Sequence, residues 1–125
     1  MYDIRANVID NLLYVILKGN FEQPEAAQLQ SKLAKSVAML KPGFAVITDI
    51  RELEPPSAEV RYILLNIMQM YVKSELALEI RIVNQNNPAV AQVFQRISHS
   101  LGYSANETFS SAQAQILIDK FLFSQ

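Results

Sequence analysis

Hydrophobic and polar positions along the first half of the chain predict three strands. Residues 3–9 alternate between apolar and polar side chains, which is typical of a strand with one exposed face. Residues 12–17 and 44–50 are almost continuously apolar, which is typical of strands covered on both faces. We therefore expect the strand at 44–50 to lie inside the sheet.

A fourth run, residues 78–83, alternates apolar residues with Glu79 and Arg81. Charged side chains are unfavourable on a buried face. We therefore expect one face of this strand, or its edge, to meet water.

Apolar side chains at helical spacing predict four helices, which begin near Pro24, Ser57, Pro88 and Ser110. The second of them has the most complete core stripe, formed by Val60, Ile63, Leu64, Ile67, Met68 and Tyr71. The resulting order is β-β-α-β-α-β-α-α. Right-handed crossovers make the second to fourth strands parallel, with the first strand antiparallel. The pattern predicts one α/β domain over residues 1–125, with a four- to five-stranded mixed sheet and about four helices.

The composition excludes several classes of function. The chain has 125 residues, half of them hydrophobic, which is enough for one sizeable core. Its net charge of −1 provides no basic excess for a nucleic-acid backbone. It has no cysteine and a single histidine, so thiolate nucleophiles and thiolate metal sites are excluded. We expect no metal, no cofactor and no nucleic-acid partner.

The sequence shows neither a signal peptide nor a membrane span. The N-terminus carries Asp3 and Arg5, and the longest uninterrupted apolar run is residues 12–17. A membrane-spanning helix needs roughly 20 apolar residues. We therefore expect a cytoplasmic protein without a membrane partner.

Three short segments carry a family resemblance. Residues 12–22, LLYVILKGNFE, contain a turn at Gly19, residues 46–53 carry Asp49, and Gly102 ends the third helix. With the order of elements, these segments resemble STAS domains, the family of anti-sigma factor antagonists and sulfate-transporter C-terminal domains. The resemblance extends from Tyr2 to about Leu122. It implies a SpoIIAA-like fold and a regulatory role in binding a protein partner.

The loop before the second helix departs from the STAS pattern. Phosphoregulated members have Asp-Ser-Ser/x-Gly there, and a serine accepts phosphate from a partner kinase. The matching positions are Ser57, Ala58, Glu59 and Val60. The acceptor position therefore has no hydroxyl, so either phosphate does not regulate this chain or Glu59 supplies a permanent negative charge. A register shift of two residues would instead place Ser57 on the acceptor position.

The same residues also have structural interpretations. Ser57 suits a helix N-cap, which we favour because the family's flanking residues are missing. Glu59 in the first turn favours the helix dipole, and we prefer this role to a phosphate mimic. Asp49 has no histidine or second carboxylate near it in sequence, so we expect a structural acid that binds loop amides at a strand end rather than a general base. His99 falls outside the apolar stripe of its helix, which predicts a surface position.

The second helix carries more apolar side chains than one sheet face can bury. Tyr62, Leu65, Met70 and Val72 lie outside its core stripe. Either the first helix covers them, or they form a surface for a partner or for a homodimer.

We expect a non-enzymatic regulatory module that resembles an anti-sigma factor antagonist and binds an anti-sigma-factor-like protein or another regulator. The expected contact residues are Asn20, Phe21, Glu22, Glu52, Glu54, Ser57, Glu59, Tyr62 and Leu65. An enzyme is disfavoured because no paired titratable groups occur at workable spacing. The alternative is a carrier that binds a small apolar ligand or a lipid in a pocket between the sheet and the helices.

Overall fold

The computed structural model describes residues 1–125 and contains five strands and four helices. In chain order they are β1 (Tyr2–Asn7), β2 (Leu12–Gly19), α1 (Gln23–Ala38), β3 (Ala45–Leu53), α2 (Ala58–Lys73), β4 (Leu78–Ile82), α3 (Ala89–Ser100), β5 (Asn106–Thr108) and α4 (Ser111–Phe123).

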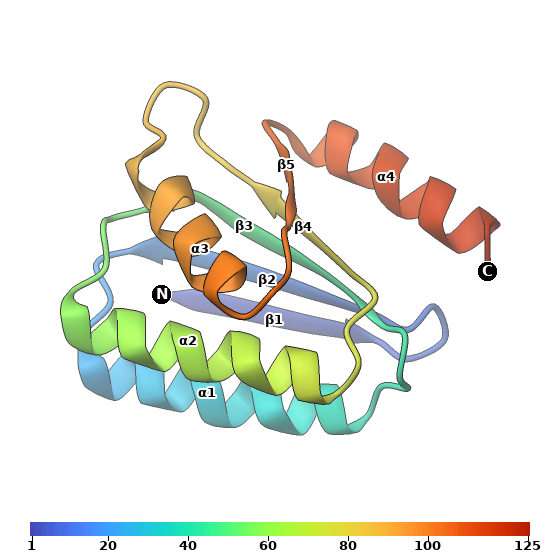
Figure 1. Cartoon of the computed structure of the whole chain (residues 1–125), viewed down its shortest axis with the longest axis horizontal. Coiled ribbons are helices and arrows are strands. Elements are labelled where there is room, and N and C mark those ends of the chain that lie inside the picture. The colour runs from blue at the N-terminus through green and yellow to red at the C-terminus, as the bar shows by residue number, and fades with distance from the viewer.

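The strands form one mixed sheet in the order β1-β2-β3-β4-β5 (Figure 1). β1 pairs with β2 in antiparallel orientation through a tight hairpin, in which Asn11 adopts a φ of 59°. The strands from β2 to β5 are parallel because a helix or a longer connection lies between each pair. β3 is the central strand, as the sequence predicts.

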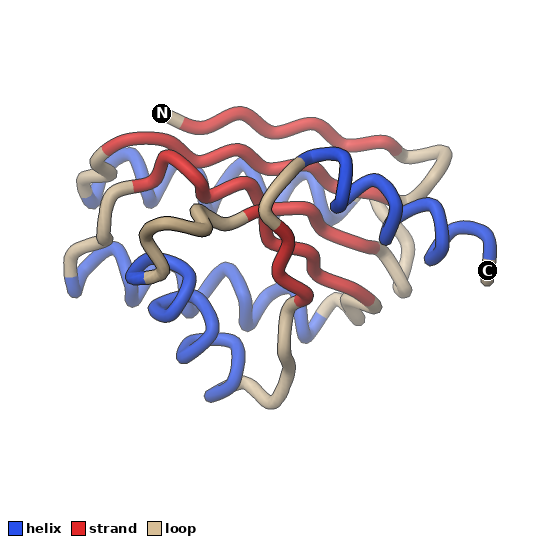
Figure 2. Tube along the Cα trace, turned by 90° about the horizontal axis from the view of Figure 1, so that it is seen from above, coloured by secondary structure: helices blue, strands red, loops and turns tan.

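Helices cover the two faces of the sheet (Figures 1 and 2). α1, α2 and α3 pack on one face, where 22 buried residues form the main core. α4 packs on the opposite face, where a second core has 7 buried residues. α2 buries all six residues of its predicted core stripe. This α/β architecture agrees with the predicted fold class.

Two strands differ from the sequence prediction. β5 lies in a segment that the pattern predicts to be a connector, because Asn-Glu-Thr has no apolar alternation. β3 continues three residues beyond the predicted strand, to Leu53. Lys18 and Gly19 of β2 extend the ladder there by pairing with Glu52 and Leu53.

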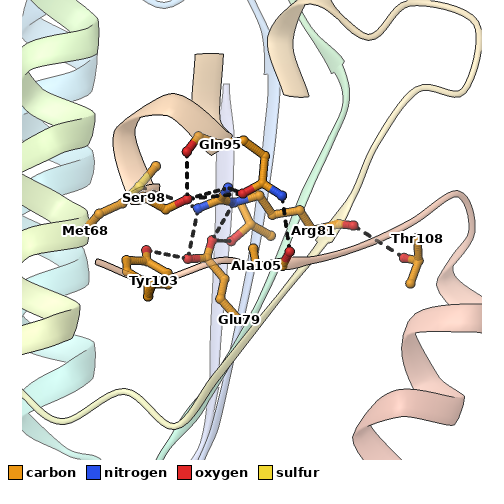
Figure 3. A network of polar contacts seen from close by, with 9 residues as sticks. Met68, Glu79, Arg81, Gln95, Ser98, Tyr103, Ala105 and Thr108 are labelled. Carbon is orange, nitrogen blue, oxygen red and sulfur yellow. Dashed lines mark hydrogen bonds and ion pairs between the residues drawn. The ribbon is translucent and has the colours of Figure 1, made fainter. Parts of the chain in front are cut away.

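The prediction that Glu79 and Arg81 meet water is wrong. Their exposed fractions are 3% and 0%, because β5 covers the edge of β4 and α3 covers this face. The Arg81 guanidinium donates to both carboxylate oxygens of Glu79, at 3.0 and 3.2 Å (Figure 3). Its remaining N–H groups reach Gln95, Ser98 and the sulfur of Met68. The buried charge is tolerated because every N–H of the guanidinium has a partner.

Further hydrogen bonds join this pair to three other parts of the chain. The hydroxyls of Tyr103 and Thr48 donate to the Glu79 carboxylate at 2.7 and 3.3 Å. The amide of Gln95 donates to the carbonyl of Ala105 at 3.2 Å (Figure 3). The network therefore holds α3, and the segment that follows it, against β3 and β4.

Candidate functional site

The ends of β2 and β3 lie side by side at the carboxyl edge of the sheet. The ammonium of Lys18 lies 3.1 Å from the Glu52 carboxylate, and the N–H of Glu54 donates to the carbonyl of Gly19 at 3.0 Å. Gly19 has a φ of +74°, a conformation that glycine adopts without steric cost, so the chain turns sharply after β2. The two loops that the sequence predicts to form one surface are therefore held together.

Six of the predicted contact residues are exposed along this edge, and we call them the rim surface. They are Asn20, Glu22, Glu52, Glu54, Ser57 and Glu59. Four of the six are glutamates, so the rim surface is acidic. Tyr62, with 67% of its surface exposed, and the half-buried Leu65 continue it along α2.

Phe21 does not belong to this surface. It is only 6% exposed and lies in the main core, where its ring centroid is 6.4 Å from that of Tyr2. Its side chain is not available to a partner, contrary to the prediction. Its buried ring holds the loop between β2 and α1 against the main core, because Phe21 follows the turn at Gly19 by only two residues.

The extra apolar side chains of α2 do not form one continuous patch. Met70 packs against the main core, whereas Val72 is 42% exposed near the opposite end of the helix from Tyr62. Self-association through α2 stays a prediction.

Ser57 is the N-cap of α2, as the sequence predicts. Its hydroxyl oxygen accepts a hydrogen bond from the backbone N–H of Val60 at 3.3 Å. Ala58 and Glu59 follow as exposed residues of the first turn, where the Glu59 carboxylate favours the helix dipole. Pro56 is buried against the core and fixes the corner before the helix.

Asp49 lies inside β3 rather than at its end. Its carboxylate accepts hydrogen bonds from the backbone N–H of Arg51 at 3.1 Å and from the guanidinium of the same residue at 2.8 and 3.1 Å. This hydrogen bonding raises the pKa of Arg51. A structural rather than a catalytic role for Asp49 stays a prediction, and the predicted strand-end position is wrong because β3 runs on to Leu53.

The structure contains neither a metal-binding cluster nor a membrane-spanning helix. No group of three or more His, Cys, Asp or Glu side chains is placed to hold a metal ion. No helix combines the length and apolar character that crossing a membrane demands. His99 is exposed, as predicted.

The space between the sheet and helices α1–α3 is filled by side chains. The cavities there measure about 20 Å³ and about 10 Å³. One water needs roughly 10–15 Å³, and small-molecule sites occupy roughly 300 Å³ or more. A lipid or apolar ligand therefore has no room between the sheet and helices α1–α3.

The buried network around Glu79 and Arg81 was missed by sequence reasoning. Its two charged side chains are almost fully buried, Gln95 and Tyr103 at its margin are partly exposed, and no buried side-chain N or O atom lacks a hydrogen-bond partner. Burial, and then the charge of Glu79, raise the pKa of both Tyr71 and Tyr103 above the usual range for tyrosine. An acidic and a basic residue two positions apart on a strand face provided the only sequence signal.

Comparisons with known proteins agree with this fold. No protein-family model and no curated protein sequence matches the chain. The structure is similar to that of the anti-sigma factor antagonist SpoIIAA in its unphosphorylated form, with a TM-score of 0.66 and 15% sequence identity. The match covers 96% of this chain and 97% of that one. The chain has the SpoIIAA-like fold that the sequence resemblance implies.

Proposed function

We propose that this chain is a non-enzymatic regulatory module that binds a protein partner through the rim surface and the adjoining turns of α2. The observation that carries the proposal is the pairing of two loops into one exposed, acidic surface beside a capped helix start. The similar structure is that of an anti-sigma factor antagonist, which favours an anti-sigma-factor-like protein or another regulator as the partner.

The charge of the rim surface indicates what the partner must offer. Glu22, Glu54 and Glu59 are exposed and form no ion pair within 4 Å, whereas Glu52 is paired with Lys18. A partner with a basic patch complements these carboxylates, and charge complementarity contributes chiefly to the association rate and to specificity. Tyr62 adds an aromatic side chain of the kind enriched at protein interfaces.

The proposed mechanism does not use a phosphate switch. The two positions after Ser57 have no hydroxyl, and the hydroxyl of Ser57 is engaged as the helix cap. The Glu59 carboxylate lies in the first turn of α2, where it favours the helix dipole. Mass spectrometry after incubation with ATP and a cell extract is expected to find no phosphate on Ser57, and phosphate at that residue would contradict this mechanism.

Quantitative affinity capture from the cytosol tests the proposed function. The wild-type chain and its Glu59→Arg variant are immobilised in parallel, and captured proteins are compared by mass spectrometry. We expect a protein that the wild type retains and the variant loses, followed by titration of that protein in purified form. Reversal of one charge at the centre of a basic–acidic contact is expected to weaken binding by about tenfold or more.

Lys35→Glu is the matched control because Lys35 is an exposed charge on α1, outside the rim surface. Equal capture by the wild type, Glu59→Arg and Lys35→Glu chains would contradict a role for the rim surface.

A further inference from the structure

A shallow groove of about 380 Å³ lies between α2 and α3 on their outer surface, where the two helices pack against each other over the main core (Figure 1). On α2 it is lined by Ala58, Arg61, Tyr62 and Leu65. These residues are three, four and seven positions apart, so they lie on one face of the helix. The groove lies directly beside the rim surface, because Glu59 and Tyr62 are neighbours on successive turns of α2.

The base of the groove is apolar. Leu65 and Ile97 line it and are half-buried, and Ile97 also packs against the main core. Tyr62 extends this apolar surface outward, with 67% of its own surface exposed. An apolar surface that is rimmed by charged side chains is typical of an interaction site.

The two arginines of the groove have no acidic partner within the chain. Three of the five arginines, Arg5, Arg51 and Arg81, pair with a carboxylate within 4 Å. The other two are Arg61 and Arg96, which are both exposed and both line this groove, and no aspartate or glutamate lines it. A guanidinium forms its strongest hydrogen bonds with carboxylates, often two at once. The groove therefore combines an apolar base with two groups that are free to bind carboxylates.

An α-helix fits this groove better than a small molecule does. Small-molecule sites enclose most of the surface of the ligand, whereas this groove is open to solvent. Packed helices lie about 8–10 Å apart, with the side chains of one between those of the other. An amphipathic helix with apolar residues at i, i+3 or i+4, and i+7 would cover the apolar base along two turns of α2.

The neighbouring rim surface disfavours a lipid bilayer at this place. Glu59 is exposed one turn from Tyr62 on the same helix. A flat anionic surface that reached Arg61 and Arg96 would also meet this carboxylate. A single helix is narrow enough to lie in the groove beside it.

We propose that this groove binds an acidic amphipathic helix of the protein partner. The apolar face of that helix packs on Tyr62, Leu65 and Ile97. Its carboxylates pair with Arg61 and Arg96. This role rests on the proposed function, because it names the part of the partner that contacts the adjoining turns of α2. A partner bound at both places is basic where it meets the rim surface and acidic where it meets the groove, and this alternation of charge fixes its orientation.

Selection of peptides by the chain tests the chemistry of the occupant. The probe is a phage-displayed library of helix-forming peptides whose surface positions are randomised. The relevant set consists of the peptides that the wild type enriches and the double variant Arg61→Glu with Arg96→Glu does not. We expect this set to carry glutamate or aspartate beside apolar residues at i, i+3 or i+4, and i+7. An empty set, or a set without acidic residues, would overturn the proposal.

Fluorescence anisotropy of one selected peptide measures the effect of each arginine. Arg61→Glu and Arg96→Glu should each raise the dissociation constant about tenfold or more, because each replaces an ion pair by a repulsion. Both arginines are exposed, so these variants are expected to fold. Lys35→Glu is the matched control, because Lys35 is an exposed cation on α1, and its affinity should equal that of the wild type. Equal weakening by Lys35→Glu would attribute the effect to net charge and overturn the groove.

The location of the peptide is tested by filling the groove without a change of charge. Ala58 is exposed in the first turn of α2 and lines the groove, so Ala58→Trp is expected to fold and to occupy part of it. This variant should raise the dissociation constant of the peptide about tenfold. Unchanged affinity in Ala58→Trp would exclude the groove as the binding site.

Exchange of charges tests direct pairing with Arg61. Each acidic residue of the peptide is changed in turn to arginine, and every such peptide is titrated with the wild type and with Arg61→Glu. At one position, the changed peptide should bind Arg61→Glu more tightly than it binds the wild type. No such recovery at any position would overturn the proposed pairing.

Glu59→Arg separates this proposal from the proposed function. It adds a positive charge beside the groove, so the selected peptide should bind this variant at least as tightly as the wild type, and weaker binding would overturn the groove. In affinity capture from the cytosol, a protein that Glu59→Arg loses and Arg61→Glu retains would overturn the groove and keep the rim surface. Loss in Arg61→Glu with retention in Glu59→Arg would instead contradict the rim surface and support the groove.

Sedimentation with phosphatidylcholine–phosphatidylglycerol vesicles tests the competing anionic surface. We expect the chain to remain in the supernatant. Wild-type protein that sediments with the vesicles, and loses this property in Arg61→Glu with Arg96→Glu, would assign the groove to a lipid bilayer and overturn the proposal.

Discussion

At the scale of single residues, the pair formed by Glu79 and Arg81 shows how a charged side chain is kept inside this protein. Both are almost fully buried, and the guanidinium has a partner for each N–H. A buried ion pair adds little stability relative to apolar side chains, but removal of one member leaves the other unpaired in the interior. The cost of a single substitution is therefore much larger than the net contribution of the pair.

Glu79→Gln is expected to lower the free energy of unfolding by about 3–5 kcal/mol, because Arg81 remains buried without a counter-charge. Urea denaturation monitored by circular dichroism measures the change. Asp3→Asn is the matched control at the exposed pair with Arg5, and there we expect less than about 1 kcal/mol. The double variant Glu79→Leu with Arg81→Met should recover most of the loss. Similar small losses of stability in Glu79→Gln and Asp3→Asn would contradict this account.

Ser57→Ala is expected to lower the free energy of unfolding by about 1 kcal/mol, because the backbone N–H of Val60 loses its partner. Ser57→Asp should stay close to the wild type, since a carboxylate both caps the helix and favours its dipole. Ser110→Ala provides the comparison, because Ser110 caps α4 in the same way by accepting from the N–H of Gln113 at 3.1 Å. If urea denaturation finds the same free energy of unfolding for Ser57→Ala as for the wild type, the Ser57 hydroxyl does not stabilise α2 as a cap.

At the scale of elements, α4 is the least firmly packed helix. Two of its residues, Ala114 and Ile118, are buried, compared with four in α1 and six in α2. Local opening costs least where few apolar contacts are lost. We expect α4 amides to exchange hydrogen with solvent at a lower free energy of opening than α1 or α2 amides.

Native-state hydrogen exchange on the wild-type chain tests this order. Exchange of α4 only through global unfolding would contradict it. Ile118→Ala should speed α4 exchange further, and Leu33→Ala, in the main core, should instead lower the global stability by about 2–5 kcal/mol.

The strands show which elements a sequence pattern can specify. The run at 44–50 predicts a central strand because apolar side chains on both faces of a strand must both be buried. β3 is the central strand, and most of its side chains are buried. β5 has three residues and one buried side chain, Thr108, so it carries no periodic signal. The end of β3 includes the charged residues Arg51 and Glu52, and it forms a strand only because Lys18 and Gly19 of β2 pair with Glu52 and Leu53.

At the scale of the whole molecule, the sequence predicts the topology and the position of the rim surface, because both follow from where strands end and helices begin. It does not predict which face each charged residue occupies. Glu79 and Arg81 alternate with apolar residues as an exposed strand would, and only the placement of α3 and β5 determines that they are buried. Likewise, only the return of the chain into the core determines that Phe21 lies beneath the rim surface.

The same buried region makes the stability of the whole molecule sensitive to alkaline pH. Burial, followed by the charge of Glu79, raises the pKa of Tyr71 and Tyr103 above the value of about 10 in an unfolded chain. The folded state therefore keeps protons that the unfolded state releases. The contribution of these tyrosines to stability is complete below pH 10 and is lost as the pH rises further, by up to about 1.4 kcal/mol per pH unit for each group.

Urea denaturation between about pH 9 and pH 11.5 is expected to show this decline. Tyr71→Phe should reduce the slope by about one proton, because it removes a hydroxyl that ionises only in the unfolded chain. Tyr62→Phe is the control, since that ring is 67% exposed, and its slope should match the wild type. A slope that Tyr71→Phe leaves unchanged would mean that Tyr71 ionises as readily in the folded protein, which its burial beside Glu79 does not allow.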